Sequence, residues 1–366
     1  MKIVIITDRQ VEQGGTNEIT KHIVKALSPN HDITIRSLIP DQYMPKLFPK
    51  KWQSIYRILY LRRISKERQF DQYDMIITLQ PDSHCIKHRN HLVYFQHHMR
   101  QYYDLFRISL CQRKKIRKKI AFLILTSLAR FADNIFLIPN LRASHVLVNS
   151  KTVGLRLVKY NKFSSFDIVN PGCAVPQDIP SKIQYISVGQ EDRSGQTILA
   201  FSRLELIQKG IDLIMDVALL TPCYNFIIAG PCCDSKVNDE RRNIPNLTFV
   251  IKNFSDEEKD LLYRNCDVFL APYIDEDFGI TPLEANSYGK PVVYCKDSGE
   301  IVYTQSHKTT GYMCSRNPTS LIKGIKFCLS NRERMKPKCI LNASQYTWSR
   351  FENCIRKHVE NITPKR

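Results

Sequence analysis

Residues 267–294 read DVFLAPYIDEDFGITPLEANSYGKPVVY. The apolar run 267–271 predicts a buried strand, Pro282 suits the first turn of a helix, and 291–294 predicts the next strand. A strand, a helix and a second strand in this order form a parallel pair with the helix across one face. Because open parallel sheets bind ligands at the carboxyl ends of their strands, we expect a site in the loop before Pro282.

The same alternation fills the rest of the chain in two blocks. Strands are predicted at 2–7, 32–38, 74–79, 91–95 and 143–148, then at 197–201, 224–229 and 246–251. Helices are predicted at 16–27, 211–220 and 255–264, the last with a capping box from Ser255 to Glu258. The 366 residues therefore predict an α/β chain of two doubly wound Rossmann-like domains, 1–185 and 186–345, facing across a cleft. The linker is expected within 176–196.

The composition indicates a globular protein, with 43% hydrophobic and 10% aromatic residues. The longest apolar run, residues 120–128, is far shorter than the roughly 20 residues that cross a bilayer. The start, MKIVIITD, reads as a buried strand and lacks a signal-peptide cleavage site. The 12 cysteines include no CxxC pattern, so we expect reduced thiols and a cytoplasmic location, with peripheral attachment to a membrane surface as an option.

Charge is concentrated in one half of the chain. Residues 1–190 hold 30 Lys and Arg against 13 Asp and Glu, which gives +17, whereas residues 191–366 hold 24 against 22, which gives +2. The first half is therefore expected to face an anionic partner, either nucleic acid, a membrane surface or a phosphorylated acceptor. Its basic stretches are 113–119 (RKKIRKK) and 52–68. The former precedes the apolar run and fits a helix resting on anionic lipid, a nucleic-acid contact or a solvated face.

Two pairs of charged residues in the second block are candidate ligands for a charged sugar donor. Arg203 and Lys209 flank the turn after the strand 197–201, where a guanidinium and an ammonium can bind an anion. A cation at that helix start opposes the helix dipole unless an anion is nearby. Glu276 and Glu284 stand eight residues apart, on either side of a Phe-Gly pair and Pro282. This run fits either a loop before a helix with an acidic first turn or a site for a charged sugar donor.

Other candidate residues follow predicted strands. The glycines Gly14 and Gly15 open the first helix, where bare backbone can approach an anion. Gly230 ends the strand 224–229 and fits either a base or ribose contact or a tight turn. His97 and His98 follow the strand 91–95, where a histidine can donate to a sugar hydroxyl.

Together these residues resemble the family 4 retaining glycosyltransferases of GT-B fold. The likeness covers most of the chain. It rests on the glycine pair, on HVLVNSKTVGLRLVKY followed by VNPGC, on R-L-x4-K-G at 203–210 and on E-x7-E at Glu276 and Glu284. MRQYYD and FADNIFLIPNLRASHVLVNS resemble the mannosyltransferase-rich branch. Trp348 matches a tryptophan before a final helix, 346–366, which by this resemblance crosses back to the first domain.

The resemblance implies a role for each residue. Arg203 and Lys209 would neutralise the donor diphosphate and stabilise its departure. Glu276 would bind the transferred sugar, and Glu284 the ribose. The backbone amides of Phe278, Gly279 and Ile280 would hold phosphate or sugar hydroxyls, and Gly14 and Gly15 would allow the first domain to close on the donor. Gln96, His97 and His98 compete for the position of the family's first-domain histidine.

The predicted function is retaining transfer of a mannose- or glucose-type hexose from a GDP- or UDP-linked donor to a glycan or lipid-linked acceptor. The alternatives are a glycosyltransferase acting on modified DNA and a non-catalytic nucleotide-sugar-binding protein. No cofactor or metal is expected, because the two cations can serve in place of a metal. The carboxylates of Asp275 and Asp277 are not assigned to a metal.

Overall fold

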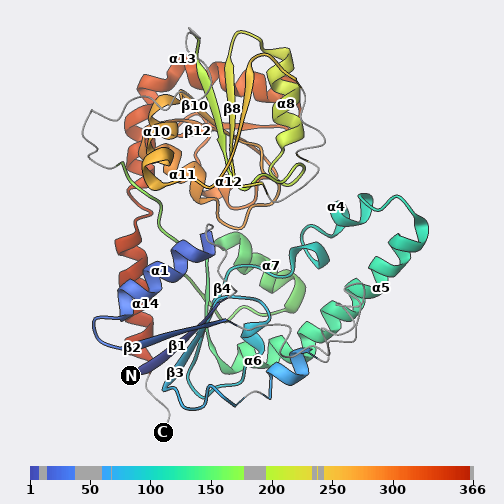
Figure 1. The fold of residues 1–366 in the computed structure, drawn as a ribbon, viewed down its shortest axis with the longest axis vertical. Helices are drawn as coiled ribbons and strands as arrows, with labels where there is room; N and C mark the ends of the chain where they lie inside the picture. The colour runs from blue at the N-terminus through green and yellow to red at the C-terminus, as the bar shows by residue number, and fades with distance from the viewer. Residues whose placement is uncertain are drawn as a thin grey trace. The chain divides into compact units, whose positions relative to one another are not determined.

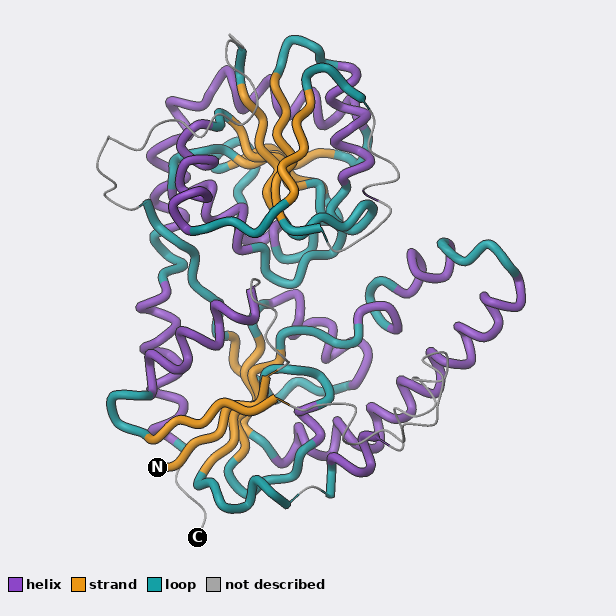
Figure 2. The backbone as a smooth tube through the Cα atoms, viewed as in Figure 1, coloured by secondary structure: helices purple, strands orange, loops and turns teal. Residues whose placement is uncertain are grey.

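The computed structural model describes residues 1–7, 15–37, 60–66, 68–176, 195–232, 237 and 243–362. The chain divides into two compact units, Met1–Asn170 with Ser349–Arg366, and Pro171–Trp348. Each unit contains one six-stranded sheet, and every pairing of neighbouring strands in it is parallel (Figures 1 and 2). The expected doubly wound α/β architecture is confirmed for both.

The sheet of the first unit has the strand order β2-β1-β3-β4-β5-β6. Its strands are β1 (Lys2–Thr7), β2 (Asp32–Ser37), β3 (Met75–Thr78), β4 (His91–Phe95), β5 (His145–Val148) and β6 (Asp167–Ile168). Its helices before the second unit are α1 (Gly15–Leu27), α4 (Phe106–Cys111), α5 (Ile116–Ala132), α6 (Ile138–Ala143) and α7 (Lys151–Asn161). The central strands are fully buried, as their apolar sequences predict for a sheet covered on both faces.

The sheet of the second unit has the order β12-β11-β10-β7-β8-β9. Its strands are β7 (Thr197–Phe201), β8 (Asn225–Gly230), β9 (Leu247–Ile251), β10 (Val268–Ala271), β11 (Val292–Cys295) and β12 (Gly311–Cys314). Its helices are α8 (Ile211–Leu220), α10 (Asp256–Asn265), α11 (Ile280–Ser287), α12 (Ile301–Thr304) and α13 (Pro318–Ala343). The strand, helix and strand expected in 267–294 are β10, α11 and β11.

The last helix, α14 (Trp348–Asn361), belongs to the first unit. Its residues Phe351, Ile355 and Val359 are buried there. The ring of Phe351 meets that of Tyr94 on β4 edge-on, with 5.7 Å between centroids. A final helix that returns to the first unit is therefore confirmed.

The division between the units falls earlier than the predicted boundary. The backbone N–H of Cys173 donates to the carbonyl of Tyr346 at 2.9 Å, and Cys173 forms a parallel bridge with Thr347. This pairing joins the two ends of the second unit, which runs from Pro171 to Trp348. The predicted boundary at 185/186 lies outside the described residues, as do Gly14 and most of 52–68.

A long helical arm extends from the first unit. The helices α5 and α6 join through a π-helical turn, Asp133–Leu137, into a 28-residue stretch that is long and apolar enough to cross a membrane by length and composition. The apolar run 120–128 is shorter than this helical stretch, because polar residues interrupt the run without ending the helix. Phe106 of α4 stacks on Phe122 of α5 at 5.7 Å, and Figure 1 shows both helices reaching away from the sheet.

Candidate active site

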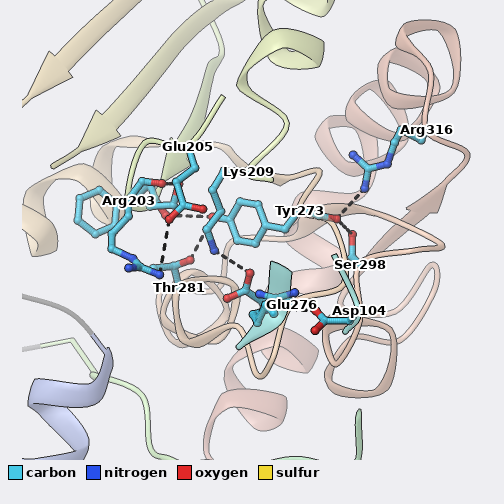
Figure 3. A network of polar contacts seen from close by, with 12 residues as sticks. Asp104, Arg203, Glu205, Lys209, Tyr273, Glu276, Thr281, Ser298 and Arg316 are labelled. Carbon is cyan, nitrogen blue, oxygen red and sulfur yellow. Dashed lines mark hydrogen bonds and ion pairs between the residues drawn. The ribbon is translucent and has the colours of Figure 1, made fainter. Parts of the chain in front are cut away.

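The turn after β7 and the loop after β10 meet at the carboxyl ends of their strands. Gly210, at φ 64°, lies so close to this loop that a Cβ atom would stand 2.5 Å from the carbonyl of Pro272. This approach brings Nζ of Lys209 to 2.7 Å from Oε2 of Glu276 (Figure 3). The resemblance implies that Lys209 binds the diphosphate and that Glu276 binds the sugar. The structure places these two side chains in direct contact.

Lys209 is buried, which is unusual for a lysine. Its ammonium lies 4.4 Å from the centroid of the Tyr273 ring, a cation–π contact that adds to the ion pair with Glu276. The Tyr273 hydroxyl donates to the carbonyl of Phe201 at 3.0 Å and lies 3.2 Å from Oγ1 of Thr281. Tyr273 therefore links the end of β7, the lysine and the first turn of α11.

The backbone around Glu276 is fixed by the segment that follows β11. Glu276 donates its N–H to Ser298, and its carbonyl accepts from Glu300 at 2.9 Å. Gly299, at φ 64°, packs so closely that a Cβ atom would lie 2.3 Å from the carbonyl oxygen of Glu276. The carboxylate of Glu276 is thus held on a rigid loop.

Sequence reasoning missed the residues that brace this loop. Arg316 donates to the carbonyls of Pro272 and Tyr273, at 2.7 and 2.6 Å, and pairs with Asp297 (Figure 3). The hydroxyl of Ser298 donates to the same Tyr273 carbonyl at 2.8 Å. No local pattern signals these contacts, since they join positions 19 to 44 residues apart.

Glu284 lies one turn into α11. Gly279 is the N-cap of this helix, at φ 84°, and has no side chain to cap the first-turn amides, which suits an anionic ligand there. The hydroxyl of Tyr263 donates to Oε2 of Glu284 at 2.7 Å. Tyr263 is fully buried, and burial together with this carboxylate raises the pKa of its phenol, so it remains a donor. The carboxylate of Glu284 is therefore oriented before any ligand binds.

The other predicted residues of the second unit are placed differently. The Arg203 side chain is 53% exposed, and its Nη2 lies 3.7 Å from Oε1 of Glu205. Gly230, at φ 141°, faces the carbonyl of Ser202, which a Cβ atom would meet at 1.8 Å. Backbone packing alone therefore explains why this position needs a glycine, and no ligand contact is required to explain it. Phe278 is buried against other apolar side chains of the unit, and Ile280 begins α11.

In the first unit the structure separates three neighbouring candidates. Gln96 is buried, donates to the carbonyl of Leu79 at 3.2 Å and accepts from Oγ1 of Thr16 at 3.0 Å. It therefore holds the first turn of α1, the helix that begins at Gly15. His97 is partly exposed, and its Nδ1 donates to the carbonyl of His98 at 2.8 Å.

His98 lies inside an aromatic cluster. Its ring stands 5.0 Å from that of Phe95 and 4.4 Å from that of Tyr103, between centroids, and Nε2 donates to Oδ1 of Asn161 at 2.7 Å. Burial lowers the pKa of His98 to about 4. This is the environment of a neutral core histidine, so of the two the accessible side chain is His97.

A buried charge group follows the His97 segment directly. Asp104 lies 2.7 Å from Nε of Arg100 and 3.7 Å from Nη2 of Arg156, and its side chain is only 2% exposed. The four-residue spacing of Arg100 and Asp104, within MRQYYD, is a signal for an ion pair that sequence reasoning did not use. This group sets two guanidinium groups in fixed positions beyond the end of β4.

One group of side chains among the described residues has metal-ligand spacing. Nε2 of His145 lies 2.9 Å from Nδ1 of His358 and 3.9 Å from Oδ2 of Asp167. These residues come from β5, α14 and β6 of the first unit, and none belongs to the loops described above. The hydrogen bond between the two imidazoles accounts for their contact.

Residues 184–345 match the family model described as "Glycosyl transferases group 1". Over this segment the chain is similar to the group 1 glycosyl transferases. The match contains Arg203, Lys209, Glu276 and Glu284.

Curated relatives agree with this assignment over parts of their length. A glycogen synthase from Thermodesulfovibrio yellowstonii is 26% identical over 180 residues, 44% of this chain and 34% of that protein. The O-antigen chain mannosyltransferase C of Escherichia coli is 23% identical over 177 residues, 47% of each chain. The human α-1,3/1,6-mannosyltransferase ALG2 is 34% identical over 80 residues, 22% of this chain and 19% of that protein. The matched segments span less than half of each relative.

Solved structures establish the fold over the whole chain. Sucrose-phosphate synthase from Thermosynechococcus elongatus superposes with a TM-score of 0.71 at 13% identity, over 98% of both chains. Anabaena HepE, solved in complex with UDP and glucose, superposes with a TM-score of 0.69 at 16% identity, over 98% of this chain and 99% of that one. The chain therefore has the GT-B fold.

Proposed function

We propose that this protein is a group 1 glycosyltransferase that moves a hexose from a nucleoside-diphosphate sugar to a hydroxyl of a glycan or lipid-linked acceptor, with retention of configuration at the anomeric carbon. The observation that carries the proposal is the contact of Lys209 with Glu276, a buried cation beside a carboxylate at the carboxyl end of a parallel sheet. The diphosphate and the transferred sugar are adjacent groups of one donor, so their ligands are expected side by side. The complex of HepE with UDP and glucose supports a nucleotide-sugar donor by analogy.

The chemistry follows from the charge of the leaving group. Departure of the nucleoside diphosphate builds negative charge on its terminal phosphate, and Lys209 and Arg203 would offset that charge. Lys209 is already fixed by its contacts, whereas the exposed Arg203 would reorient toward the anion. Loss of one such contact typically costs about 3–4 kcal/mol of barrier. The amides at the start of α11 would add donors, and Glu284 would accept from the ribose.

On the acceptor side we propose His97 rather than His98 or Gln96. His97 is the partly exposed side chain of the three, and it follows β4 at the carboxyl end of the first sheet. An imidazole there can hydrogen-bond a sugar hydroxyl. The amino terminus of α1, at Gly15, would face the same ligand.

The decisive experiment is transfer by purified protein from a panel of GDP- and UDP-hexoses to a lipid-linked or free glycan acceptor. Lys209→Ala is expected to lower turnover about 100- to 1,000-fold. Its matched control is Lys259→Ala, which removes a partly exposed lysine paired with Asp256 at 2.6 Å on α10 and is expected to leave turnover unchanged. Full turnover of Lys209→Ala would refute the assignment.

The same assay separates the alternatives. Nucleotide-sugar binding without transfer to any acceptor or to water would identify a non-catalytic binding protein, and transfer to modified DNA alone would identify a DNA glycosyltransferase. NMR of the product reports retention or inversion. We propose that the reaction needs no divalent metal, so turnover in EDTA should equal that in magnesium or manganese. We also propose that the protein is cytoplasmic.

A further inference from the structure

The arm formed by α4 and α5 carries a stripe of exposed apolar side chains. On α5 and the π-helical turn after it the exposed fractions are 72% for Ile116, 52% for Ile120, 44% for Leu123, 56% for Ile124, 57% for Phe131 and 46% for Ile135. At about 100° per residue these positions fall within roughly one third of the helix circumference. They form an apolar stripe along the helix, which the exposed Ser127 interrupts between Ile124 and Phe131.

The stripe lies opposite the face with which α5 packs on its own unit. That inner face carries the buried residues Phe122, Thr126, Ala129 and Ala132. Because these residues already contact protein, lipid cannot surround the helix in this fold, even though its length and composition would allow it to span a bilayer. The geometry suits a helix that lies on a membrane with one face in the lipid.

Positive charge borders the stripe at the start of α5. Residues 105–132 contain eight Lys and Arg and no Asp or Glu, and six of these cations lie in 113–119. Lys115, Arg117 and Lys118 are exposed and stand at the N-cap and first turn, where cations oppose the helix dipole. An anionic surface beside this turn would offset that unfavourable interaction. The charge and the apolar stripe together select one partner class, an anionic lipid bilayer.

The base of the arm is joined to the His97 segment. Arg130 donates from Nε to the carbonyl of Tyr102 at 2.8 Å, and the hydroxyl of Tyr103 donates to Asp133 at 2.7 Å. Tyr102 and Tyr103 follow His97 by five and six residues. A membrane that binds along α5 would therefore contact the helix to which the His97 segment is anchored.

We propose that α5 docks the enzyme on an anionic membrane, with its apolar stripe in the lipid and the 113–119 cations on the headgroups, and that the acceptor is presented from that surface. The inference rests on the proposed function for the identity of the acceptor. The docking itself is independent of catalysis. Lys209→Ala is therefore expected to bind membranes as the wild type does.

Vesicle co-sedimentation without donor tests the docking directly. The full chain is expected to bind phosphatidylcholine vesicles containing phosphatidylglycerol and to bind pure phosphatidylcholine at least about tenfold more weakly. Lys115→Glu with Lys118→Glu should weaken binding to the anionic vesicles about tenfold or more, and acidic residues at a helix start preserve the helix. Ile120→Asn with Ile124→Asn should weaken it by a similar factor.

The matched control for the stripe is Leu219→Asn with Leu220→Asn on α8, whose side chains are 50% and 61% exposed. This pair is expected to leave vesicle binding unchanged. Circular dichroism and thermal unfolding of each variant show whether it remains folded. Equal binding by the Ile120/Ile124 variant and the wild type would overturn the proposal, as would equal binding to neutral and anionic vesicles.

Other occupants of the stripe give different results. One such result is that the wild type binds no vesicles and sediments as a dimer, whereas the Ile120/Ile124 variant sediments as a monomer. This result would identify a second copy of the chain as the partner. A second such result is that the wild type binds no vesicles but binds a DNA duplex in a salt-sensitive way, and that the Lys115/Lys118 variant loses this binding. This result would identify nucleic acid as the partner. Either outcome overturns membrane docking and leaves the transfer assay to judge the proposed function separately.

Discussion

The Nζ atom of Lys209 lies 2.7 Å from Oε2 of Glu276, although 67 positions separate the two residues in the chain. The turn before α8 supplies the cation and the loop before α11 supplies the carboxylate. With side chains 8% and 17% exposed, both charges are largely withdrawn from water. Each group is therefore oriented by the other before a donor binds, and removal of either leaves a partly buried charge without its partner.

The pair should show energetic coupling in the unliganded protein. Lys209→Met and Glu276→Gln are each expected to lower the free energy of unfolding, and the double variant by about 1–3 kcal/mol less than the sum. Urea unfolding of all four proteins measures this coupling. The control cycle is Lys259→Met with Asp256→Asn, an exposed pair whose coupling should stay below about 0.5 kcal/mol. Equal coupling in the two cycles would contradict a buried, preorganised pair.

Glu284 should distinguish a nucleotide from its phosphates. Glu284→Gln is expected to weaken binding of a nucleoside diphosphate about tenfold, because ribose hydroxyls donate more strongly to a carboxylate than to an amide. Pyrophosphate, which has no ribose, should bind both proteins equally in calorimetry. Tyr263→Phe removes the phenol that orients the carboxylate and should cause a smaller loss in the same direction. Equal weakening of both ligands would exclude the ribose role.

Buried histidines should make the first unit sensitive to acid. Burial lowers the pKa of His98 to about 4, whereas the unfolded value is about 6.5. Below pH 6.5 the unfolded chain therefore binds more protons than the folded one, and the free energy of unfolding falls as the pH drops toward 4. The loss attributable to His98 is at most about 3 kcal/mol.

His98→Phe isolates this contribution. The variant keeps an aromatic ring in the cluster but has no group to protonate there, so its free energy of unfolding should fall less steeply between pH 6.5 and 4 than that of the wild type. Parallel curves in urea unfolding at a series of pH values would show that His98 carries no part of the acid sensitivity.

The helix α14 should contribute strongly to the stability of the first unit. Phe351→Ala, at a site where the side chain is only 1% exposed, is expected to lower the free energy of unfolding by about 3–5 kcal/mol. Lys357→Ala on the exposed face of the same helix should change it by less than about 0.5 kcal/mol. A similar small effect of both substitutions in urea unfolding would mean that α14 is not integral to this core.

Local sequence signals predicted the fold well. The apolar run 91–95 became β4 with the same bounds, and the capping box from Ser255 to Glu258 opens α10 as expected. These signals depend only on neighbours along the chain. The strand β12 and the 26-residue helix α13 were not predicted, since mixed polar and apolar residues obscure the core-facing positions of both.

The site was less accessible to sequence reasoning, because its geometry depends on long-range packing. The pattern in 275–284 pointed to Glu276 and Glu284, yet nothing local showed that Lys209 contacts the first or Tyr263 the second. His97 and His98 look alike in sequence. Tyr103 and the distant Asn161 enclose His98, and only the folded chain reveals that difference.

The return of α14 has a consequence for the order in which the protein can mature. Phe351, Ile355 and Val359 complete the core of the first unit, but the ribosome adds them after the whole of Pro171–Trp348. The amino-terminal unit therefore cannot finish folding ahead of the other, as amino-terminal domains ordinarily do during synthesis. Until α14 emerges, the surface that it covers on the β4 side of the sheet is exposed, so chaperone binding to nascent chains should cease only when translation passes this helix.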